Sequence, residues 1–140
     1  MAAKGKEFRY AVSIERDGRI GAEGLSPLAT PDGWSPEHLV LAGLVRCSLT
    51  SLRYHAERIG VDVVGSGSAA STIARREADG RFAFAEIELR LDLELEPEPP
   101  GEELAALLAK AERDCFIGAS LTVGPRYHWT VNGRDVAAAL

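Results

Sequence analysis

The chain has 140 residues, 46% of them hydrophobic, and a net charge of −5. This length and composition exclude a mainly disordered protein and fit one hydrophobic core, so we expect residues 1–140 to form a single domain. The negative charge argues against nucleic acid as a partner, because proteins that bind the phosphate backbone carry a concentrated basic surface.

The first residues, Met1–Lys6, lead into a predicted strand rather than into the apolar region of a signal peptide. No apolar run reaches the roughly 18 residues that span a bilayer. We therefore expect a cytoplasmic protein with no membrane partner. In that compartment two distant cysteines are not expected to form a permanent disulfide, and they lack the close spacing of a zinc site. Inert buried thiols and redox-active thiols both remain open.

A hairpin is predicted at the N-terminal end. Apolar and polar residues alternate over residues 8–14, which predicts a strand with one buried face. Residues 17–18 (Asp-Gly) predict a two-residue turn, and residues 19–25 the returning strand, so Arg16 and Arg19 are expected to face each other. A guanidinium at the core-side end of a strand keeps its proton and needs a carboxylate, a thiolate or water. An arginine that simply reaches solvent is the alternative.

A long helix is predicted next. Ser35 is a suitable N-cap and Pro36 suits the first helical position, and the helix is expected to continue to Ile59 and to stop at Gly60. Between residues 39 and 49 the apolar side chains surround the helix instead of forming one stripe, which predicts burial on most sides. A small single chain cannot easily cover such a helix. We therefore expect part of it to pack against a second copy of the protein.

Two further strands are predicted in the middle of the chain. Residues 61–68 lead into a weak strand over residues 69–77, and residues 79–80 (Asp-Gly) turn the chain into a long second strand. In that strand apolar and charged residues alternate, which predicts one buried and one solvated face. The predicted buried face consists of Ala85, Ile87, Leu89, Leu91, Leu93 and Leu95.

The last third predicts two helices and a strand. Apolar residues at i, i+3, i+4 and i+7 predict a helix over residues 102–113. Asp114 is expected to cap a further helical segment over residues 115–121, which places Cys115 at a helix N-terminus, where the dipole favours a thiolate. A strand over residues 127–131 completes the order. Hairpins that are separated from helices predict an α+β fold.

This order of elements and three motifs resemble the OsmC/Ohr family of thiol peroxidases. The motifs are Arg16-Asp17-Gly18 closing the hairpin, Ser35-Pro36-Glu37 followed after nine residues by Cys47, and Cys115 after a Leu/Ala-rich helix. The resemblance implies an OsmC-like α+β fold, with an N-terminal hairpin and antiparallel sheets around a central buried helix, in an intertwined homodimer. It also implies an antioxidant oxidoreductase that needs no cofactor and reduces organic hydroperoxides to alcohols.

The resemblance assigns roles to four residues. Cys47 is the peroxidatic thiol and Cys115 the resolving thiol, and Arg16 and Glu37 form a polar pair that organises the site, with Arg19 as the substitute for Arg16. These residue types suit the chemistry, because a nearby cation favours the attacking thiolate and a second thiol converts the resulting sulfenic acid into a disulfide. An external dithiol, for some family members a lipoyl-bearing protein, is the expected reductant. Expected substrate contacts are Leu44, Phe116 and Ile117.

The spacing of Glu37 and Cys47 limits this arrangement. Ten residues on one helix correspond to about 15 Å at 1.5 Å per residue, so one arginine can hardly touch both. Either the helix begins after Glu37, or Glu37 and Arg16 act on the thiol of the partner subunit. We favour the second arrangement.

The chain also departs from the family pattern after each cysteine and in the loop from Ser26 to Trp34, which is short for the family. Pro-Val-Ser often follows the second cysteine, where this chain has Phe116-Ile117-Gly118, and an aromatic residue commonly follows the first cysteine, where this chain has Ser48.

The sequence also allows a function of another class. A non-enzymatic dimer that binds an apolar small molecule, with inert thiols, is the alternative to the peroxidase. A cysteine hydrolase lacks a paired base, because none of the three histidines has a recognisable catalytic setting and His55 is expected on a solvated helix face. Metal binding has no support in the sequence. The histidines are His38, His55 and His128.

Overall fold

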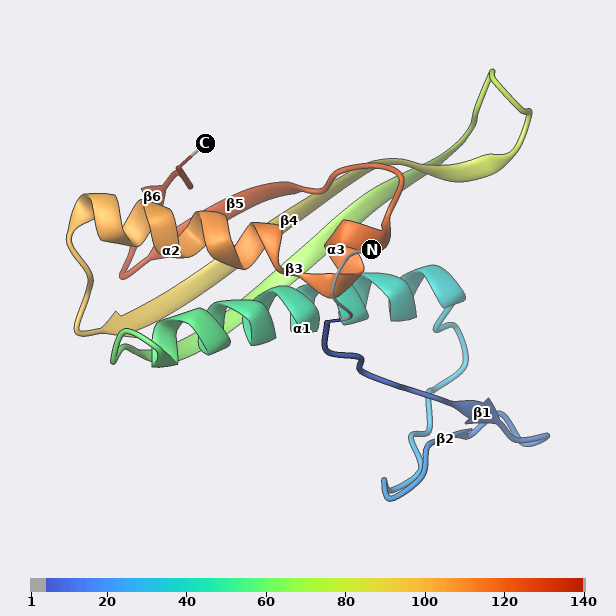
Figure 1. Cartoon of the computed structure of the whole chain (residues 1–140). Coiled ribbons are helices and arrows are strands. Elements are labelled where there is room, and N and C mark those ends of the chain that lie inside the picture. The colour runs from blue at the N-terminus through green and yellow to red at the C-terminus, as the bar shows by residue number, and fades with distance from the viewer. Residues whose placement is uncertain (1–4, 140) are drawn as a thin grey trace. The chain divides into compact units, whose positions relative to one another are not determined.

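The computed structural model describes residues 5–139 and has two compact units, one ending at Ser35 and one beginning at Pro36 (Figure 1). Most of the segment Met1–Lys6, interpreted above as the approach to a strand, lies outside the described residues. Among the residues described, no helix combines the length and the hydropathy needed to cross a membrane.

The N-terminal unit contains a short antiparallel hairpin, which confirms that prediction. It consists of β1 (Ser13–Ile14) and β2 (Ile20–Gly21). The predicted long first strand with a buried face is wrong, because only two residues are paired and a two-stranded ribbon provides no layer to cover a row of side chains. The apolar side chains of that row, Phe8, Tyr10, Val12 and Ile14, are exposed in the single chain.

The loop of this hairpin differs from the predicted two-residue turn. The Glu15 N–H donates to the Arg19 carbonyl (2.9 Å), which leaves three residues in the loop. The predicted pairing of Arg16 with Arg19 is therefore wrong. The Asp17 carboxylate accepts hydrogen bonds from the Arg19 N–H and Nε (3.1 and 2.8 Å), and Gly18 adopts the left-handed conformation (φ 89°) typical of three-residue hairpin loops.

In the second unit, α1 (Pro36–Glu57) begins where predicted and ends two residues before Ile59. Gly60 has a φ of 73°, and the Val61 N–H reaches back to the Ala56 carbonyl (3.0 Å), a hydrogen bond typical of a glycine-terminated helix. Within the single chain the sheet, α2 and α3 cover one stripe of α1, and the expected cover of its other sides by a second copy stays a prediction. The buried stripe consists of Leu44, Ser48, Ser51, Leu52 and Ala56.

One sheet of four strands, in the order β3-β4-β5-β6, supports the helices. The strands β3 (Asp62–Arg75) and β4 (Phe82–Glu96) form a long antiparallel hairpin. β5 (Arg126–Val131) runs parallel to β4, and β6 (Arg134–Val136) runs antiparallel to β5. β3 is longer than predicted, because its Gly-Ser segment pairs with β4 throughout.

The alternation predicted for β4 is confirmed from Ile87 to Leu95, where every second side chain is buried. It is wrong at Ala85, which is exposed. Thr72 pairs with Glu86 but Ile73 pairs with Phe84, so Ala85 is the extra residue of a β-bulge, and the inward-facing positions change phase there.

The helices α2 (Gly101–Arg113) and α3 (Phe116–Ser120) follow the hairpin. The predicted periodicity of α2 is confirmed. Figure 1 shows α1 and α2 side by side on one face of the sheet. The core lies between these two helices and the strands β4 and β5. The fold is thus the expected α+β arrangement, with helices gathered on one face of a sheet. The buried residues of α2 are Leu104, Leu107, Leu108 and Ala111.

Candidate functional site

The two cysteines meet between α1 and α3. Cys47 of α1 is partly buried and Cys115 just before α3 is fully buried, and the two free thiols are neighbours, close enough for Cys115 to act on the ionisation of Cys47. Burial raises the pKa of Cys47, and the neighbouring Cys115 raises it further. The backbone N–H groups of Ile117 and Phe116 act in the opposite direction, because hydrogen bonds to the sulfur favour the thiolate.

Cys115 itself forms the N-cap of α3. Its Sγ accepts a hydrogen bond from the Gly118 N–H (3.4 Å), and its backbone has the extended conformation that an N-cap needs. The prediction that Asp114 caps this helix is therefore wrong. Asp114 instead ends α2, where its N–H donates to the Lys110 carbonyl (3.0 Å).

A serine and a tyrosine complete the surroundings of Cys115. Ser48 is fully buried, and its Oγ lies 3.5 Å from the Cys115 Sγ and 3.2 Å from the Tyr127 hydroxyl. Burial raises the pKa of Tyr127 strongly, so its hydroxyl keeps its proton. Neither residue is among the site residues predicted from the sequence. Ser48 gave a signal, since a hydroxyl buried in an apolar helix requires a partner, whereas Tyr127 meets Cys115 only through the fold.

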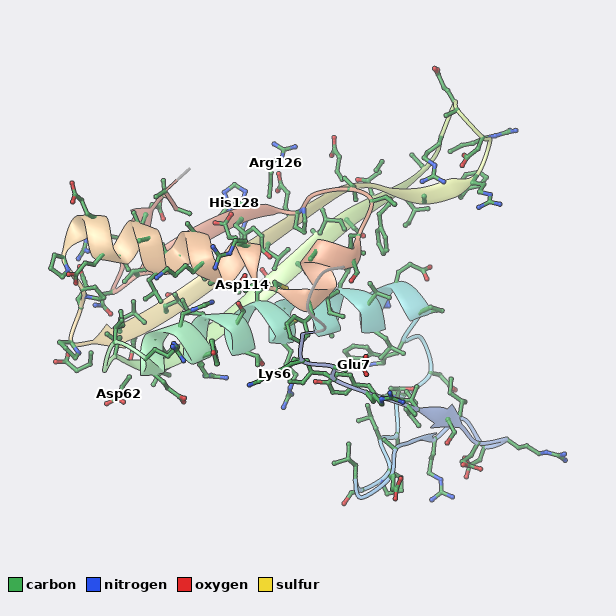
Figure 2. The ribbon with its side chains drawn as sticks, viewed as in Figure 1. Lys6, Glu7, Asp62, Asp114, Arg126 and His128 are labelled. Carbon is green, nitrogen blue, oxygen red and sulfur yellow. The ribbon has the colours of Figure 1, made fainter. Side chains whose placement is uncertain are left out.

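Neighbouring groups hold the Tyr127 ring in place. The ring stacks on Trp129 with centroids 5.6 Å apart and planes 7° apart, and the Trp129 Nε1 donates to the Glu112 carboxylate of α2 (2.8 Å). His128, between the two aromatic residues on β5, points with Arg126 to the opposite face of the sheet (Figure 2). This histidine therefore lies away from the thiols.

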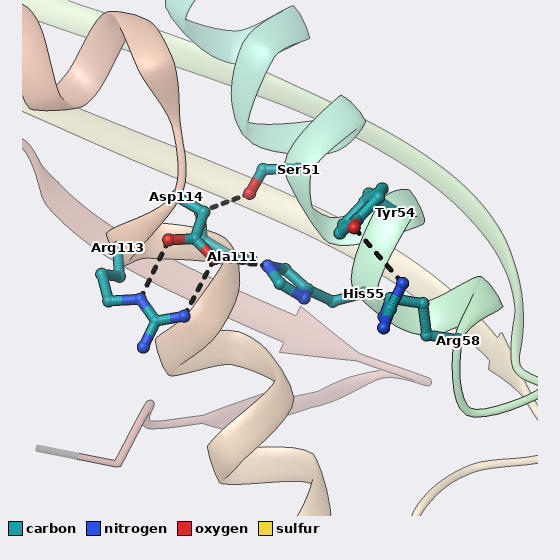
Figure 3. A network of polar contacts seen from close by, with 7 residues as sticks. All are labelled: Ser51, Tyr54, His55, Arg58, Ala111, Arg113 and Asp114. Atoms are coloured by element: carbon teal, nitrogen blue, oxygen red, sulfur yellow. Dashed lines mark hydrogen bonds and ion pairs between the residues drawn. The ribbon is translucent and has the colours of Figure 1, made fainter. Parts of the chain in front are cut away.

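A second polar network joins α1 to the end of α2 (Figure 3). The Asp114 carboxylate accepts hydrogen bonds from the Arg113 guanidinium (2.9 and 3.0 Å) and lies 2.7 Å from the His55 Nε2. These contacts, chiefly that with Arg113, lower the pKa of Asp114 to about 2. The Ser51 hydroxyl donates to the Ala111 carbonyl (2.9 Å). The predicted solvated position of His55 is wrong, because its side chain is only 13% exposed.

Glu37 lies in the first turn of α1, so the alternative in which the helix begins after Glu37 is wrong. Its side chain lines a groove of about 400 Å³ whose other walls are mainly apolar. On one continuous helix Glu37 and Cys47 stay about 15 Å apart. The other residues of this groove are Ile73, Phe82, Ala83, Phe84, Leu121, Thr122 and Val123.

The three residues predicted to contact substrate have different environments. Leu44 is completely buried in the core, one helical turn before Cys47. Phe116 and Ile117 are 54% and 39% exposed, and their backbone lies against the Cys47 sulfur. Arg16 and Arg19 belong to the N-terminal unit, so their action on the thiol stays a prediction. Within residues 5–139, no group of three His, Cys, Asp or Glu side chains is placed to hold a metal ion.

The comparison with protein families gives a match over most of the chain. A family model described as "OsmC-like protein" matches residues 29–130. A search of curated protein sequences found no match.

Solved structures share the fold at low sequence identity. An OsmC-like protein of unknown function from Vibrio cholerae has a TM-score of 0.70 and 17% identity, over 89% of this chain and 99% of that chain. An organic hydroperoxide resistance protein from Elizabethkingia anophelis has a TM-score of 0.61 and 20% identity, over 91% and 98%. The organic hydroperoxide resistance protein OhrB of Bacillus subtilis has a TM-score of 0.53 and 17% identity, over 89% and 96%. These similarities support a common architecture.

Proposed function

This chain belongs to the OsmC-like protein family, and from that membership we propose that it is a cysteine-dependent peroxidase that reduces organic hydroperoxides to alcohols. The observation that supports the proposal is the proximity of the Cys47 and Cys115 thiols, which is close enough for Cys115 to raise the pKa of Cys47. Two thiols in contact can form a disulfide without a large rearrangement, and a peroxidase of this class requires that pair. Two structural neighbours are named for organic hydroperoxide resistance, and their names support the choice of an organic hydroperoxide as the proposed substrate.

The proposed reaction has three balanced steps. The Cys47 thiolate attacks the terminal oxygen of the hydroperoxide, the O–O bond breaks, and the alkoxide takes up a proton and leaves as an alcohol. Cys47 is then a sulfenic acid. Cys115 attacks the Cys47 sulfur, the S–S bond forms, the S–O bond breaks, and one molecule of water is released. An external dithiol, such as a lipoylated protein, reduces the disulfide by exchange and is itself oxidised.

The first step requires a cation near Cys47. Burial and Cys115 both raise the pKa of this thiol and thus oppose the thiolate. We assign the cation to Arg16, because Arg19 is already paired with the Asp17 carboxylate (2.8 Å). A guanidinium beside the sulfur would lower its pKa again.

Glu37 would orient this guanidinium through a charge-assisted hydrogen bond. Because Glu37 and Cys47 lie about 15 Å apart along α1, we propose that Arg16 and Glu37 act on the thiol of the partner subunit in a homodimer.

The surroundings of Cys47 favour an apolar substrate. Phe116 and Ile117 present exposed apolar side chains beside the thiol, and Leu44 forms part of the buried layer beneath it. An apolar entrance favours an organic hydroperoxide over hydrogen peroxide, because only the organic group gains from leaving water.

Hydroperoxide consumption with dithiothreitol as the dithiol tests the proposal. We expect the wild type to consume cumene hydroperoxide repeatedly and Cys47→Ser to be inactive. Without dithiothreitol, Cys115→Ser should react once and stop at the sulfenic acid, whereas the wild type should stop at the disulfide, because the variant has no second protein thiol to resolve the sulfenic acid. Arg16→Gln should abolish activity, while the matched control Arg19→Gln should retain most of it.

Mass measurement separates this function from the alternative. After one equivalent of hydroperoxide, the peroxidase should lose about two daltons through loss of two thiol hydrogens. An unchanged mass, with no consumption of hydroperoxide, would instead favour a dimer that binds an apolar small molecule with inert thiols.

A further inference from the structure

The Cys115 sulfur is linked through Ser48 to a phenol. The Ser48 hydroxyl lies between the Cys115 Sγ (3.5 Å) and the Tyr127 hydroxyl (3.2 Å), and both Ser48 and Cys115 are 0% exposed. A third polar group, the Gly118 N–H, points to the same sulfur (3.4 Å). A buried serine hydroxyl without these partners would destabilise the core, so its presence there requires an explanation.

The chemistry of the groups determines the hydrogen-bond directions once Cys115 has lost its proton. A thiolate only accepts, so Ser48 must then donate to the sulfur. Because a serine has one hydroxyl proton, Ser48 must in turn accept from Tyr127. The Gly118 N–H donates in every state. The deprotonated sulfur thus receives two hydrogen bonds, and the serine that gives one of them is itself oriented by the phenol.

We infer that Ser48 and Tyr127 carry the proton away from Cys115 and then hold the resulting thiolate in place for its attack on Cys47; the inference rests on the proposed peroxidase function. In this transfer the thiol proton passes to the Ser48 Oγ, the serine proton passes to the Tyr127 oxygen, and the phenol proton passes to solvent. Each hydroxyl gives one proton and receives one. Both finish in the orientations that a thiolate requires.

The surroundings of Tyr127 suit this role. Burial raises the pKa of the phenol, so it remains a proton donor and does not itself become a lasting anion. Tyr127 also lines an open groove of about 370 Å³ with Gly118, Pro125 and Glu112. In the inferred transfer this groove is the route by which the phenol proton reaches solvent. Gly118 leaves room beside these groups, since a Cβ there would lie 3.3 Å from the Tyr127 hydroxyl and 3.4 Å from the Cys115 Sγ.

Few charged or titratable groups act on this assembly. Cys47 faces Cys115 from α1, and Tyr127 faces it from β5. Glu112 of α2 raises the pKa of Tyr127 by its charge. The neighbouring Asp114 carboxylate is paired with Arg113 and His55.

The second step of the reaction then balances. The Cys115 thiolate attacks the sulfur of the Cys47 sulfenic acid, the S–S bond forms and the S–O bond breaks. The departing hydroxide takes up one proton from solvent and becomes water. This proton replaces the one that left through Tyr127, so the net products are a disulfide and one water molecule.

The inference can be tested with two variants, each of which lacks one hydroxyl oxygen of the chain. Tyr127→Phe retains the ring that stacks on Trp129, and Ser48→Ala removes only the bridging hydroxyl. Tyr54→Phe is the matched control, since this tyrosine is exposed on α1 and its hydroxyl contacts only Arg58 in the described contacts. Rapid-quench single turnovers with cumene hydroperoxide measure alcohol release and disulfide formation separately. Nuclear magnetic resonance of ¹³Cβ-labelled cysteine follows the titration of Cys115 in the reduced protein.

We expect disulfide formation to slow about tenfold in both variants at pH 7, while alcohol release stays within about twofold, because the lost hydrogen bonds stabilise the Cys115 thiolate and not the attacking Cys47 thiolate. The titration midpoint of Cys115 should rise by about one pH unit in Ser48→Ala. Tyr54→Phe should resemble the wild type. Unchanged disulfide formation in both variants would overturn the inference, and so would slower formation with an unchanged midpoint, which would indicate a purely structural role.

This test remains distinct from the test of the proposed function. If the wild type fails to consume hydroperoxide, the peroxidase proposal fails, and the inferred attack on Cys47 fails with it. The Cys115 titration in Ser48→Ala would still show whether this hydroxyl stabilises the thiolate. A shifted midpoint in an inactive protein would thus refute the activity alone.

Discussion

Gly67 of β3 lies where α1 packs against the sheet. A Cβ at this position would lie 2.7 Å from the Leu91 Cδ2, 3.0 Å from the Arg90 carbonyl oxygen and 3.1 Å from the Val45 Cγ1. Because one of these atoms is backbone and the others belong to packed side chains, we expect Gly67→Ala to lower the free energy of unfolding by about 1–3 kcal/mol. Urea unfolding measures this change. Gly101→Ala, with no atom within 4 Å, should stay within about 0.5 kcal/mol, and equal effects of the two variants would contradict the packing argument.

At the same scale, the sequence identified the thiols but not what surrounds them. Cys47 and Cys115 stood out by their chemistry, and their meeting agrees with the roles that the family resemblance implied. Ser48 was noticed only as a departure from the family pattern, and the glycines near residue 67 were interpreted as a lead into a strand. The residue type at each of these two positions is explained only by contacts that form in the folded protein. Ser48 needs Tyr127 from β5, and Gly67 needs the close approach of α1.

Between elements, the contact of Asp114 with Arg113 and His55 joins the end of α2 to α1. The folded protein lowers the pKa of Asp114 to about 2, below its usual 3.8. The unfolded chain therefore takes up this proton first as the pH falls, so the stability from Asp114 is complete above about pH 4 and is lost toward pH 2. Asp114→Asn should remove this part of the acid dependence in urea unfolding at pH 2–6. Asp62→Asn on the exposed end of β3 is the control, and an identical acid dependence in Asp114→Asn and wild type would refute the assignment.

Elements with a long regular pattern were predicted well, and elements whose geometry depends on single side chains were not. The periodicity of α2 and the alternation of β4 needed only repeated burial of one face. The alternation failed at Ala85, because one inserted residue reverses the inward direction. The hairpin loop failed because the Asp17 side chain binds the Arg19 backbone and widens the turn.

For the whole molecule, the single chain leaves many apolar side chains in water. Those of the N-terminal row are exposed, and so are Phe82 and Ile73 beside the groove that Glu37 lines. A homodimer would cover such surfaces by the hydrophobic effect. Since we assign Arg16 and Glu37 to the thiol of the partner, activity per chain should fall to zero as dilution converts dimer to monomer. Activity assays and light scattering over the same concentration range check this prediction, and a fully active monomer would exclude the shared site.

The unequal burial of the two sulfurs has a consequence for regeneration. Once the disulfide has formed, an incoming reductant can reach the partly exposed sulfur of Cys47, whereas that of Cys115 is enclosed. The mixed disulfide with the reductant would therefore form at Cys47, and Cys115 would depart as the leaving group. The Gly118 N–H donates to that sulfur, and the Ser48 hydroxyl lies 3.5 Å from it and can donate once the sulfur has no proton, so the contacts that prepare it for attack would also ease its departure. The same two groups around the Cys115 sulfur would then act in both the oxidative and the reductive half of the cycle.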